Sequence, residues 1–463
     1  MIAPRNKLLL WVGAGVVPAA TLAGMVPETA LYCVIVLIVL FTIFLVDAML
    51  SPAELNALRV SVPDVIRLST ARSGIIPLTI SRDDSKLRTL RYGLPLPPEV
   101  PAVEESAVTL LPGKSGGYRL DYACIPLRRG CYRLRRCYLE QNSRFGFWSV
   151  RRAVPIETEL RVYPNLLTER KTVAALFLNR GRFGIHAQRQ VGQGRDFEKL
   201  REYLPGDAID EIHWKATAKR NKHVTKIFQI ERTQEIYVIM DASRLCARHV
   251  ASPVVNAATP TLPQIAMPGY QEAQKPTVLD RFITSALVLG MAAERQGDLF
   301  GLLAFSDTVQ RFVRAKSGRQ HFGALRDALY TLQPRLVNPD FDELCSFIRV
   351  RLRKRALLVF LTDLDDPLLA ESFARNIHLI ARQHLVVVNM LKPDGVAQVF
   401  SNENVGEIDD IYARLSGHLR WQDLQELDRV LGRGGARLSL VENEKLAASL
   451  ISQYMAVKAR QLI

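Results

Sequence analysis

The sequence predicts an α/β protein with an N-terminal transmembrane helical hairpin, a small β-sandwich-like domain and a doubly wound parallel sheet. Three observations predict it: two uncharged apolar runs lie within the first fifty positions, short strand-like segments follow, and the C-terminal half alternates apolar strands with amphipathic helices. These changes of pattern predict a membrane anchor over residues 1–50, a β-rich domain over 51–165, a distinctive segment over 166–234 and an α/β domain over 235–463.

The predicted anchor consists of Leu8–Val26 and Thr29–Val46, which contain no charged residue. A helix needs about 20 apolar residues to cross the hydrocarbon core, so each run is long enough. Arg5 and Lys7 precede the first run, whereas only Glu28 is charged between the runs. Because cations stay inside, we expect the N-terminus and the soluble portion to be cytoplasmic. Small residues near the end of the first run leave a signal peptide as an alternative, and a buried pair of soluble helices as another.

The net charge of +15 favours an anionic partner, which is a lipid surface, nucleic acid or an acidic protein. We expect a solvated basic face beside membrane lipid. The basic stretches Arg128–Arg136 and Arg349–Arg355 lack the interleaved aromatic residues that single-strand binding favours, so no nucleic acid is expected. The six cysteines are scattered, without zinc-ligand spacing, and this suits a reducing compartment.

The β-rich domain is predicted from short segments between clusters of Gly, Pro, Asn and Asp. A small β-sandwich is the natural assembly of such strands. The predicted strands are Ile75–Ile80, Ala107–Leu111, Tyr118–Ile125, Tyr132–Leu139 and Leu160–Tyr163.

The α/β domain is predicted from strands that are apolar throughout, because both faces of a parallel sheet are covered by helices. Ile236–Met240 ends at Asp241, and Ala356–Thr362 ends at Asp363. Ligands of such sheets bind beyond the carboxyl ends of the strands, so both aspartates are candidate site residues. The other predicted strands are Leu299–Phe305, Leu385–Leu391 and Ala436–Val441, and the predicted helices are Asp280–Gln296, Gly323–Leu332, Phe341–Arg353, Leu368–Gln383 and Lys445–Arg460.

Residues 192–215 contain glycines, carboxylates and a histidine that suggest other chemistries. Gly192 and Gly194 lack the third glycine of a dinucleotide fingerprint, so a tight turn followed by a short helix from Asp196 to Tyr203 is predicted. A carboxylate-and-lysine nuclease core fails because His213 stands two positions before Lys215, where an acidic residue is needed. A metal-assisted hydrolase that uses Asp241, Asp207 and His213 remains the alternative function.

Residues 194–220 resemble the hallmark of the bacterial family called domain of unknown function fifty-eight, roughly "G-x-x-F-x-x-L-R-x-Y-x-x-G-D-x-x-R-x-I-x-W". Asp210 stands where the family usually has arginine. The resemblance implies paired transmembrane helices, a β-rich segment and a von Willebrand factor type A-like domain. The matching residues are Phe197, Leu200, Arg201, Tyr203, Gly206, Asp207 and Trp214.

The type A-like domain also implies a metal site built from D-x-S-x-S, a loop threonine and a later aspartate. Asp241, Ser243 and Asp363 match, but Leu245 replaces the second serine. We therefore predict a degenerate site that binds Mg²⁺ weakly if at all, because a hydroxyl ligand is missing. The alternative is that these aspartates only cap turns at strand ends.

The resemblance implies a membrane-anchored, non-catalytic adaptor in the bacterial inner membrane. Its type A-like domain would bind protein partners, with a MoxR-type AAA+ ATPase as the implied one, in maturation or envelope-stress control. We also expect Asp196–Arg220 to dock on the α/β domain through Trp214, and Ala247–Thr277 to be a mobile surface loop.

Overall fold

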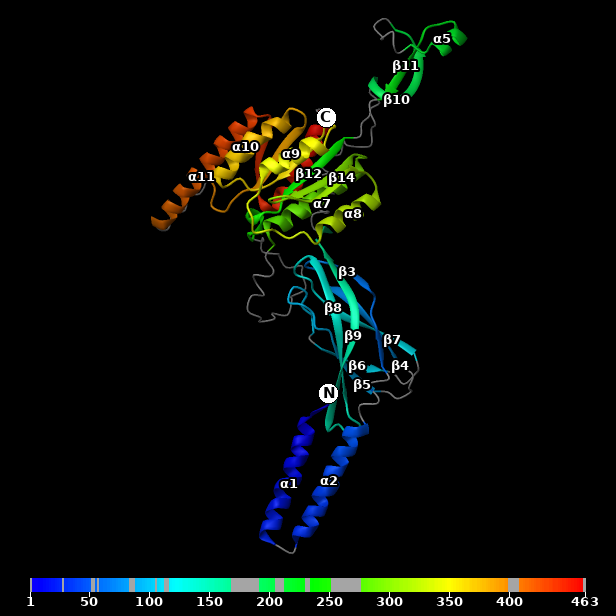
Figure 1. The fold of residues 1–463 in the computed structure, drawn as a ribbon, viewed down its shortest axis with the longest axis vertical. Coiled ribbons are helices and arrows are strands. Elements are labelled where there is room, and N and C mark those ends of the chain that lie inside the picture. Colours follow the sequence, from blue (N-terminus) through cyan, green and yellow to red (C-terminus); the bar gives the residue numbers. More distant parts are fainter. Residues whose placement is uncertain are drawn as a thin grey trace. The chain divides into compact units, whose positions relative to one another are not determined.

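The computed structural model describes residues 2–26, 29–50, 55, 58–82, 88–104, 106–111, 116–167, 191–204, 212–229, 234–250, 276–398 and 408–460. The described residues up to Asn165 form one compact unit, and those from Leu166 onward belong to a second (Figure 1). Each unit has its own hydrophobic core, and each is described separately below.

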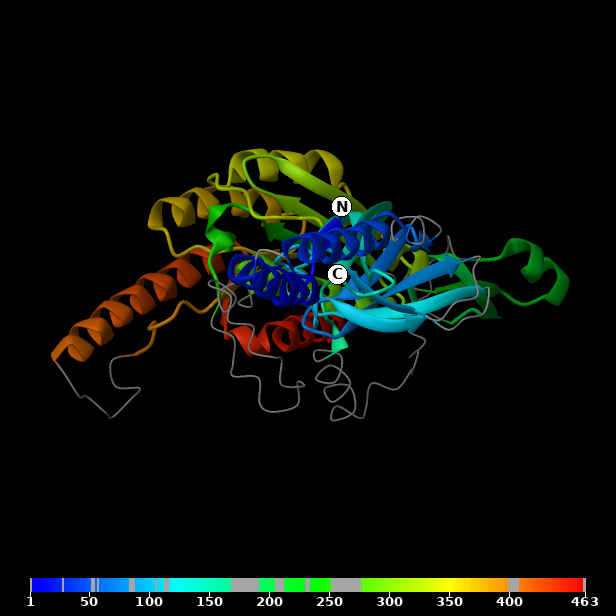
Figure 2. The ribbon, with the colours of Figure 1, turned by 90° about the horizontal axis from the view of Figure 1, so that it is seen from below.

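Helices α1 (Asn6–Met25) and α2 (Ala30–Leu50) are both long and apolar enough to cross a membrane. They lie side by side in Figures 1 and 2. Most of their side chains are exposed, including large apolar ones such as Trp11, Leu31 and Phe41. A helix that is apolar all round and covered by no protein needs an apolar surrounding.

The β-rich part of the first unit is a sandwich of two sheets around one core. The first sheet has the order β1-β9-β8-β5-β6, with β3 beside β9, and the second has the order β2-β4-β7. The predicted strands are confirmed to within a residue or as parts of longer strands, whereas β1, β2, β3 and β5 were not predicted. The strands are β1 (Ile2–Pro4), β2 (Arg59–Ser61), β3 (Val65–Ser69), β4 (Gly74–Arg82), β5 (Arg88–Gly93), β6 (Ala107–Leu111), β7 (Gly116–Cys124), β8 (Gly130–Asn142) and β9 (Trp148–Tyr163).

The turn between β8 and β9 is fastened to α2 by a buried carboxylate. Asp47 accepts hydrogen bonds from Ser143 Oγ at 2.6 Å and from the Phe145 amide at 3.2 Å. The indole of Trp148 donates to the Phe44 carbonyl at 3.0 Å. Strand β1 pairs with β9 and leads into α1, so both helices join the sandwich at one end of the β8–β9 hairpin.

The second unit contains a mixed sheet with the order β14-β13-β12-β15-β16-β17. Every strand runs parallel except β14, which is antiparallel because it follows β13 through a short turn. The predicted strands are confirmed, while β14 was not predicted. The strands are β12 (Glu235–Asp241), β13 (Leu299–Phe305), β14 (Val309–Lys316), β15 (Leu357–Leu361), β16 (Leu385–Leu391) and β17 (Ala436–Val441).

Helices cover both faces of this sheet, as the apolar strands indicated. One core lies beneath α7 (Val278–Arg295), α8 (Arg319–Leu329) and α12 (Leu446–Ala459). The other lies beneath α9 (Phe341–Arg351), α10 (Pro367–Ala381) and α11 (Ile408–Arg433). Helix α11, which the sequence did not predict, projects from the domain in both views (Figures 1 and 2).

The hallmark segment corrects a prediction: residues 196–203 are not helical. Strand β10 (Val191–Glu202) pairs with β11 (Val224–Gln229) in an antiparallel hairpin, and the short helix α5 (Trp214–Arg220) lies between them. The side chain of Trp214 is exposed to 63%, so its expected burial against the α/β domain is not observed.

Candidate functional site

The order of the parallel strands reverses between β12 and β15. Strand β13 lies on one side of β12, whereas β15, β16 and β17 follow on the other. Loops that leave the carboxyl ends of the two strands at such a point diverge to opposite faces, and ligands bind there in related sheets. Asp241 ends β12, and Asp363 comes two residues after β15. The topology therefore brings both predicted aspartates to the place where a ligand site is expected.

Asp241 is completely buried, and its carboxylate is held by hydrogen bonds. It accepts one from the Ser243 amide at 2.8 Å and another from the Thr362 hydroxyl at 2.9 Å. Burial raises the pKa of Asp241 to about 6, against hydrogen bonds to Ser243 and Thr362 that lower it. Ser243 is also buried and caps the 3₁₀ turn Arg244–Ala247. The two oxygens of Asp241 thus face the protein.

Asp363 is paired with a cation from the same chain. A guanidinium nitrogen of Arg248 lies 2.7 Å from its Oδ2, while the Asp365 amide donates to its Oδ1 at 3.2 Å. Burial raises the pKa of Asp363, and the charge of Arg248 opposes this rise. Arg248 is positioned by the strand-like contact between His249 and Thr277 and by the Val278 amide, which donates to the Arg248 carbonyl.

Three further aspartates near this edge of the sheet are paired with arginines as well. These pairs are Arg244 with Asp366, Arg335 with Asp307 and Arg420 with Asp365. Together with Arg248 and Asp363 they form what we call the charged edge. Because each arginine of the charged edge is paired with an aspartate, these residues carry little net charge.

The donor set at the charged edge fits a divalent cation poorly. A hard cation such as Mg²⁺ needs oxygen ligands in near-octahedral geometry. Here the oxygens of Asp241 accept hydrogen bonds from Ser243 and Thr362, and Arg248 lies against Asp363. Among the described residues, no group of three or more His, Cys, Asp and Glu side chains is arranged to hold a metal ion. The predicted weakness of the site stays a prediction, now with a structural reason.

Sequence reasoning missed Thr362 and Arg248. Thr362 follows the apolar strand β15 directly, and a hydroxyl at that position could have been read as a partner for Asp241. Arg248 lies in the stretch that was expected to be a loop, and only its fold against Thr277 brings its side chain to Asp363. Residues 251–275 of that predicted mobile loop lie outside the described residues.

The residues of the alternative hydrolase are used in other ways. His213 precedes α5, and its Nδ1 accepts a hydrogen bond from the Ala216 amide at 3.0 Å, which caps that helix. Asp241 is enclosed at the end of β12. Asp207 lies outside the described residues, as does Gly206.

The remaining hallmark residues build the β10–β11 hairpin. Phe197, Leu200 and Arg201 lie on β10, where Arg201 is paired with Thr225 of β11. The Tyr203 amide donates to the His223 carbonyl, and the two rings meet edge to face at 6.3 Å. Trp214 begins α5. The geometry of these residues is that of a small structural element.

Comparison with known proteins confirms the resemblance. The model of the family described as "Protein of unknown function DUF58" matches residues 199–248 and 271–397, which include part of the hallmark, Asp241, Arg248 and Asp363. No curated protein sequence matches this chain.

Solved structures with the same kind of fold are only distantly similar. BatB from Bacteroides thetaiotaomicron is 14% identical, with a TM-score of 0.30 over 49% of this chain and 99% of that chain. An aerotolerance-related membrane protein from Bacteroides fragilis NCTC 9343 is 14% identical, with a TM-score of 0.27 over 48% and 98%. The SpRpn10 VWA domain is 10% identical, with a TM-score of 0.28 over 48% and 95%.

Proposed function

We propose that this protein is a membrane-anchored, non-catalytic adaptor whose von Willebrand factor type A-like domain binds a protein partner at the charged edge. The observation that carries the proposal is the ion pair between Arg248 and Asp363 at the switch point of the sheet. The place where this fold holds ligands is occupied by side chains that neutralise one another.

The arrangement favours binding over catalysis. A nucleophile needs a base within hydrogen-bond reach and a group that orients the base. The buried hydroxyls of Ser243 and Thr362 instead bond to a carboxylate that is itself enclosed. Exposed arginines with paired carboxylates suit the recognition of a protein surface, because guanidinium groups form directional bonds to carboxylates.

The anchor gives the adaptor its location. Helices α1 and α2 have the length and apolarity of membrane spans, and Asp47 fastens α2 to the sandwich. With Arg5 and Lys7 before α1, the soluble units would face the cytoplasm of a bacterium, with the helices in its inner membrane. The family resemblance suggests a MoxR-type AAA+ ATPase as the partner, acting in maturation or envelope-stress control.

Cross-linking in membranes tests the proposal. The full chain, tagged and expressed in its native host, is cross-linked and purified in detergent, with and without a chelator. We expect a MoxR-type ATPase among the captured proteins in both conditions, and a loss of at least tenfold when Arg244 and Arg335 are both changed to glutamate.

Arg353→Glu is the matched control, because this exposed arginine lies between α9 and β15. It is therefore at the amino ends of the parallel strands, whereas the charged edge lies at their carboxyl ends. Capture that disappears on chelation would contradict a metal-independent surface. Equal capture by the control and the double variant would show that the partner binds elsewhere.

A further inference from the structure

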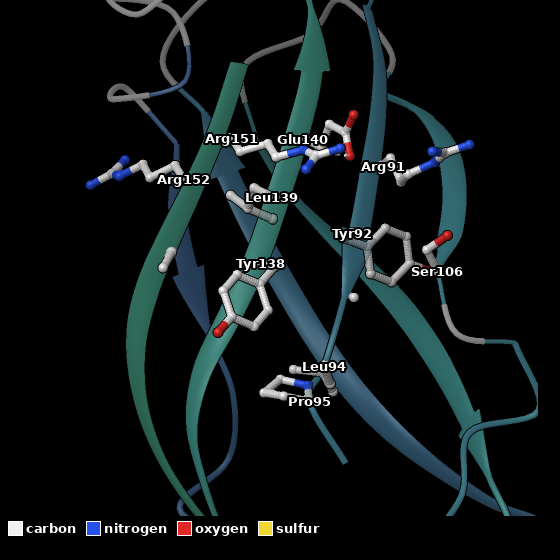
Figure 3. A pocket seen from close by; sticks show the side chains of 12 residues that line it. Arg91, Tyr92, Leu94, Pro95, Ser106, Tyr138, Leu139, Glu140, Arg151 and Arg152 are labelled. Atoms are coloured by element: carbon white, nitrogen blue, oxygen red, sulfur yellow. Dashed lines mark ion pairs between the residues drawn. The ribbon is translucent and has the colours of Figure 1, made fainter. Parts of the chain in front are cut away.

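A depression of about 760 Å³ lies on the first sheet of the sandwich (Figure 3). It spans three neighbouring strands, β5, β8 and β9, and a cavity of this size accommodates a ligand as large as a drug or a lipid headgroup. The pairing register shows how it forms. Tyr138 lies between Gly93 and Ala153, whose small side chains leave space on both sides of the phenol ring.

One end of the depression is a row of charges. Glu140 of β8 is paired across the strands with Arg91 of β5 and with Arg151 of β9. A guanidinium nitrogen of Arg151 lies 3.4 Å from Glu140, and the Ser149 hydroxyl also donates to this carboxylate. Figure 3 shows the three charged side chains in a row across the strands, with Tyr138 two residues from Glu140 along β8. With two arginines and one carboxylate, the row keeps a net positive charge.

Arg152 also lines the depression but is committed elsewhere. It donates to the carbonyls of Leu55 and Leu58 at 2.9 and 3.3 Å. Arg91 and Arg151, in contrast, are exposed to solvent, where a ligand can reach them.

The charged row lies close to the membrane helices within the same unit. Ser149, two residues before Arg151 on β9, is paired with Ala3 of β1, and α1 begins at Asn6. Trp148 contacts α2 through the Phe44 carbonyl. At about 3.3 Å per residue, Arg151 is roughly 10 Å along the strand from Trp148. Tryptophan is enriched where a membrane meets water, so the row falls at the depth of the headgroups or just above it.

We propose that this depression binds the phosphate-bearing headgroup of an anionic phospholipid, with Arg91 and Arg151 on the phosphate and Tyr138 beside the headgroup atoms on the side away from the membrane helices. Arginine suits phosphate because its planar fork donates parallel hydrogen bonds. Two arginines beside one carboxylate favour a ligand that carries negative charge over a zwitterion. A bound lipid would hold the sandwich at a fixed tilt on the membrane. The inference rests on the membrane anchoring proposed above.

Native mass spectrometry of the full chain in detergent tests the inference, with phosphatidylglycerol and phosphatidylcholine of the same acyl chains as probes. We expect phosphatidylglycerol to bind more tightly than phosphatidylcholine. Changing Arg91 and Arg151 to glutamine should reduce phosphatidylglycerol binding at least tenfold, since each cation near the headgroups contributes about fivefold. Glu140→Gln should act in the opposite direction and tighten it, and this outcome does not depend on whether the double variant folds.

The control removes two exposed arginines elsewhere on the sandwich, Arg119 of β7 and Arg133 of β8, and should leave binding unchanged. An equal loss in the control, or no preference between the lipids in the wild type, would overturn the proposal. Glycerol phosphate is added as a competitor. If it displaces the lipid at equal concentration, the ligand is a soluble phosphate and the proposal of a lipid is wrong.

Extraction of the membranes with alkaline carbonate distinguishes failure of the membrane anchoring from failure of the headgroup site. A chain that leaves the membrane refutes the anchoring. A chain that stays in the membrane but shows no lipid preference refutes only the headgroup site.

Discussion

At the scale of single residues, Arg248 decides the character of the charged edge. Its partner Asp363 has a side chain that is only 6% exposed, while Arg248 is 39% exposed. Removing one member of a fully buried pair costs about 3–5 kcal/mol, but partial exposure lets water replace some of the lost interaction. We expect Arg248→Ala to lower the free energy of unfolding by about 1–2 kcal/mol. This is less than the cost for a fully buried pair, because water replaces part of the lost interaction at the exposed arginine.

Urea denaturation of the full chain in detergent measures this effect. Arg335→Ala is the control, because Arg335 and Asp307 are 57% and 48% exposed and such surface pairs contribute less than about 1 kcal/mol. Equal destabilisation by both substitutions would mean that Arg248 has no special role.

The same residue explains why Mg²⁺ binding should be weak. The guanidinium supplies the positive charge that a metal ion would bring to Asp363, and Leu245 offers no oxygen. Calorimetry should therefore detect no sub-micromolar binding of Mg²⁺ or Mn²⁺ to the wild type. The double variant Leu245→Ser with Arg248→Ala should gain metal affinity, and this gain should vanish when Asp241→Ala is added. Tight binding by the wild type that is lost in Asp241→Ala would revive a metal-dependent site.

His384 gives the α/β domain a dependence on pH. Its side chain is buried before β16, neither ring nitrogen has a hydrogen-bond partner in the described part of the chain, and burial lowers its pKa more than the nearby Leu352 carbonyl raises it. With a folded pKa below the unfolded value of about 6.5, the unfolded chain binds the proton more readily. This residue's contribution is therefore complete above that pH and is lost as the pH falls.

We expect His384→Leu to be less sensitive to acid than the wild type between pH 7 and pH 5. Asp241 and Asp363 act in the opposite direction, because their raised pKa values favour the folded state as the pH falls. The wild type and the variant both contain these aspartates, so the comparison of their melting curves removes this effect. A control variant at the exposed His223 should follow the wild type. Identical pH profiles for the wild type and His384→Leu would contradict a buried neutral imidazole.

At the scale of elements, the C-terminal helix α12 is locked to the start of β13. The Tyr454 hydroxyl donates to the buried Asp298, which also lies 2.7 Å from the Lys458 ammonium. A hydrogen bond to a charged group contributes about 1.5–3 kcal/mol, so Tyr454→Phe should destabilise the domain by roughly that amount. Tyr412→Phe on α11 is the matched control, because Tyr412 is 67% exposed and its substitution should change stability by less than about 0.5 kcal/mol. Urea denaturation of both variants gives the comparison, and equal effects would remove the proposed role of Asp298.

The elements that the sequence predicted are those whose burial is uniform along their length. Ile236–Met240 is apolar throughout because helices cover both faces of β12, and its type and limits followed directly. Asp241 and Asp363 followed in turn, since the carboxyl edge of such a sheet is fixed by strand direction.

The errors fall where distant pairing outweighs local preference. Asp196 resembles a helix cap, and the glutamates and lysine after it favour a helix, yet β10 forms because β11, more than twenty residues later, completes its hydrogen bonds. Helix α11 was missed because its N-terminal half exposes apolar residues such as Ile411 and Leu415 instead of burying them. Arg248 could not be placed at all without the contact to Thr277.

At the scale of the whole molecule, the orientation in the membrane determines which compartment the charged edge can reach. Arg5, Lys7 and Arg144 all lie at the end of the helical pair that joins the sandwich, whereas in the sequence the charged residue between the two helices is Glu28. Cations flanking a span stay in the cytoplasm, and two spans return the chain to its starting side. We therefore expect an alkaline phosphatase fused to the C-terminus to be inactive, and one inserted at Glu28 to be active.

A green fluorescent protein fused to the C-terminus should behave in the opposite way and fluoresce, because it folds in the cytoplasm. Changing both Arg5 and Lys7 to glutamate should weaken the preference and raise the phosphatase activity of the C-terminal fusion, while the same change at Arg119 and Arg133, far from the helices in sequence, should not. High phosphatase activity at the C-terminus of the wild type would reverse the topology. A MoxR-type ATPase could then not be the partner, since it would need cytoplasmic ATP.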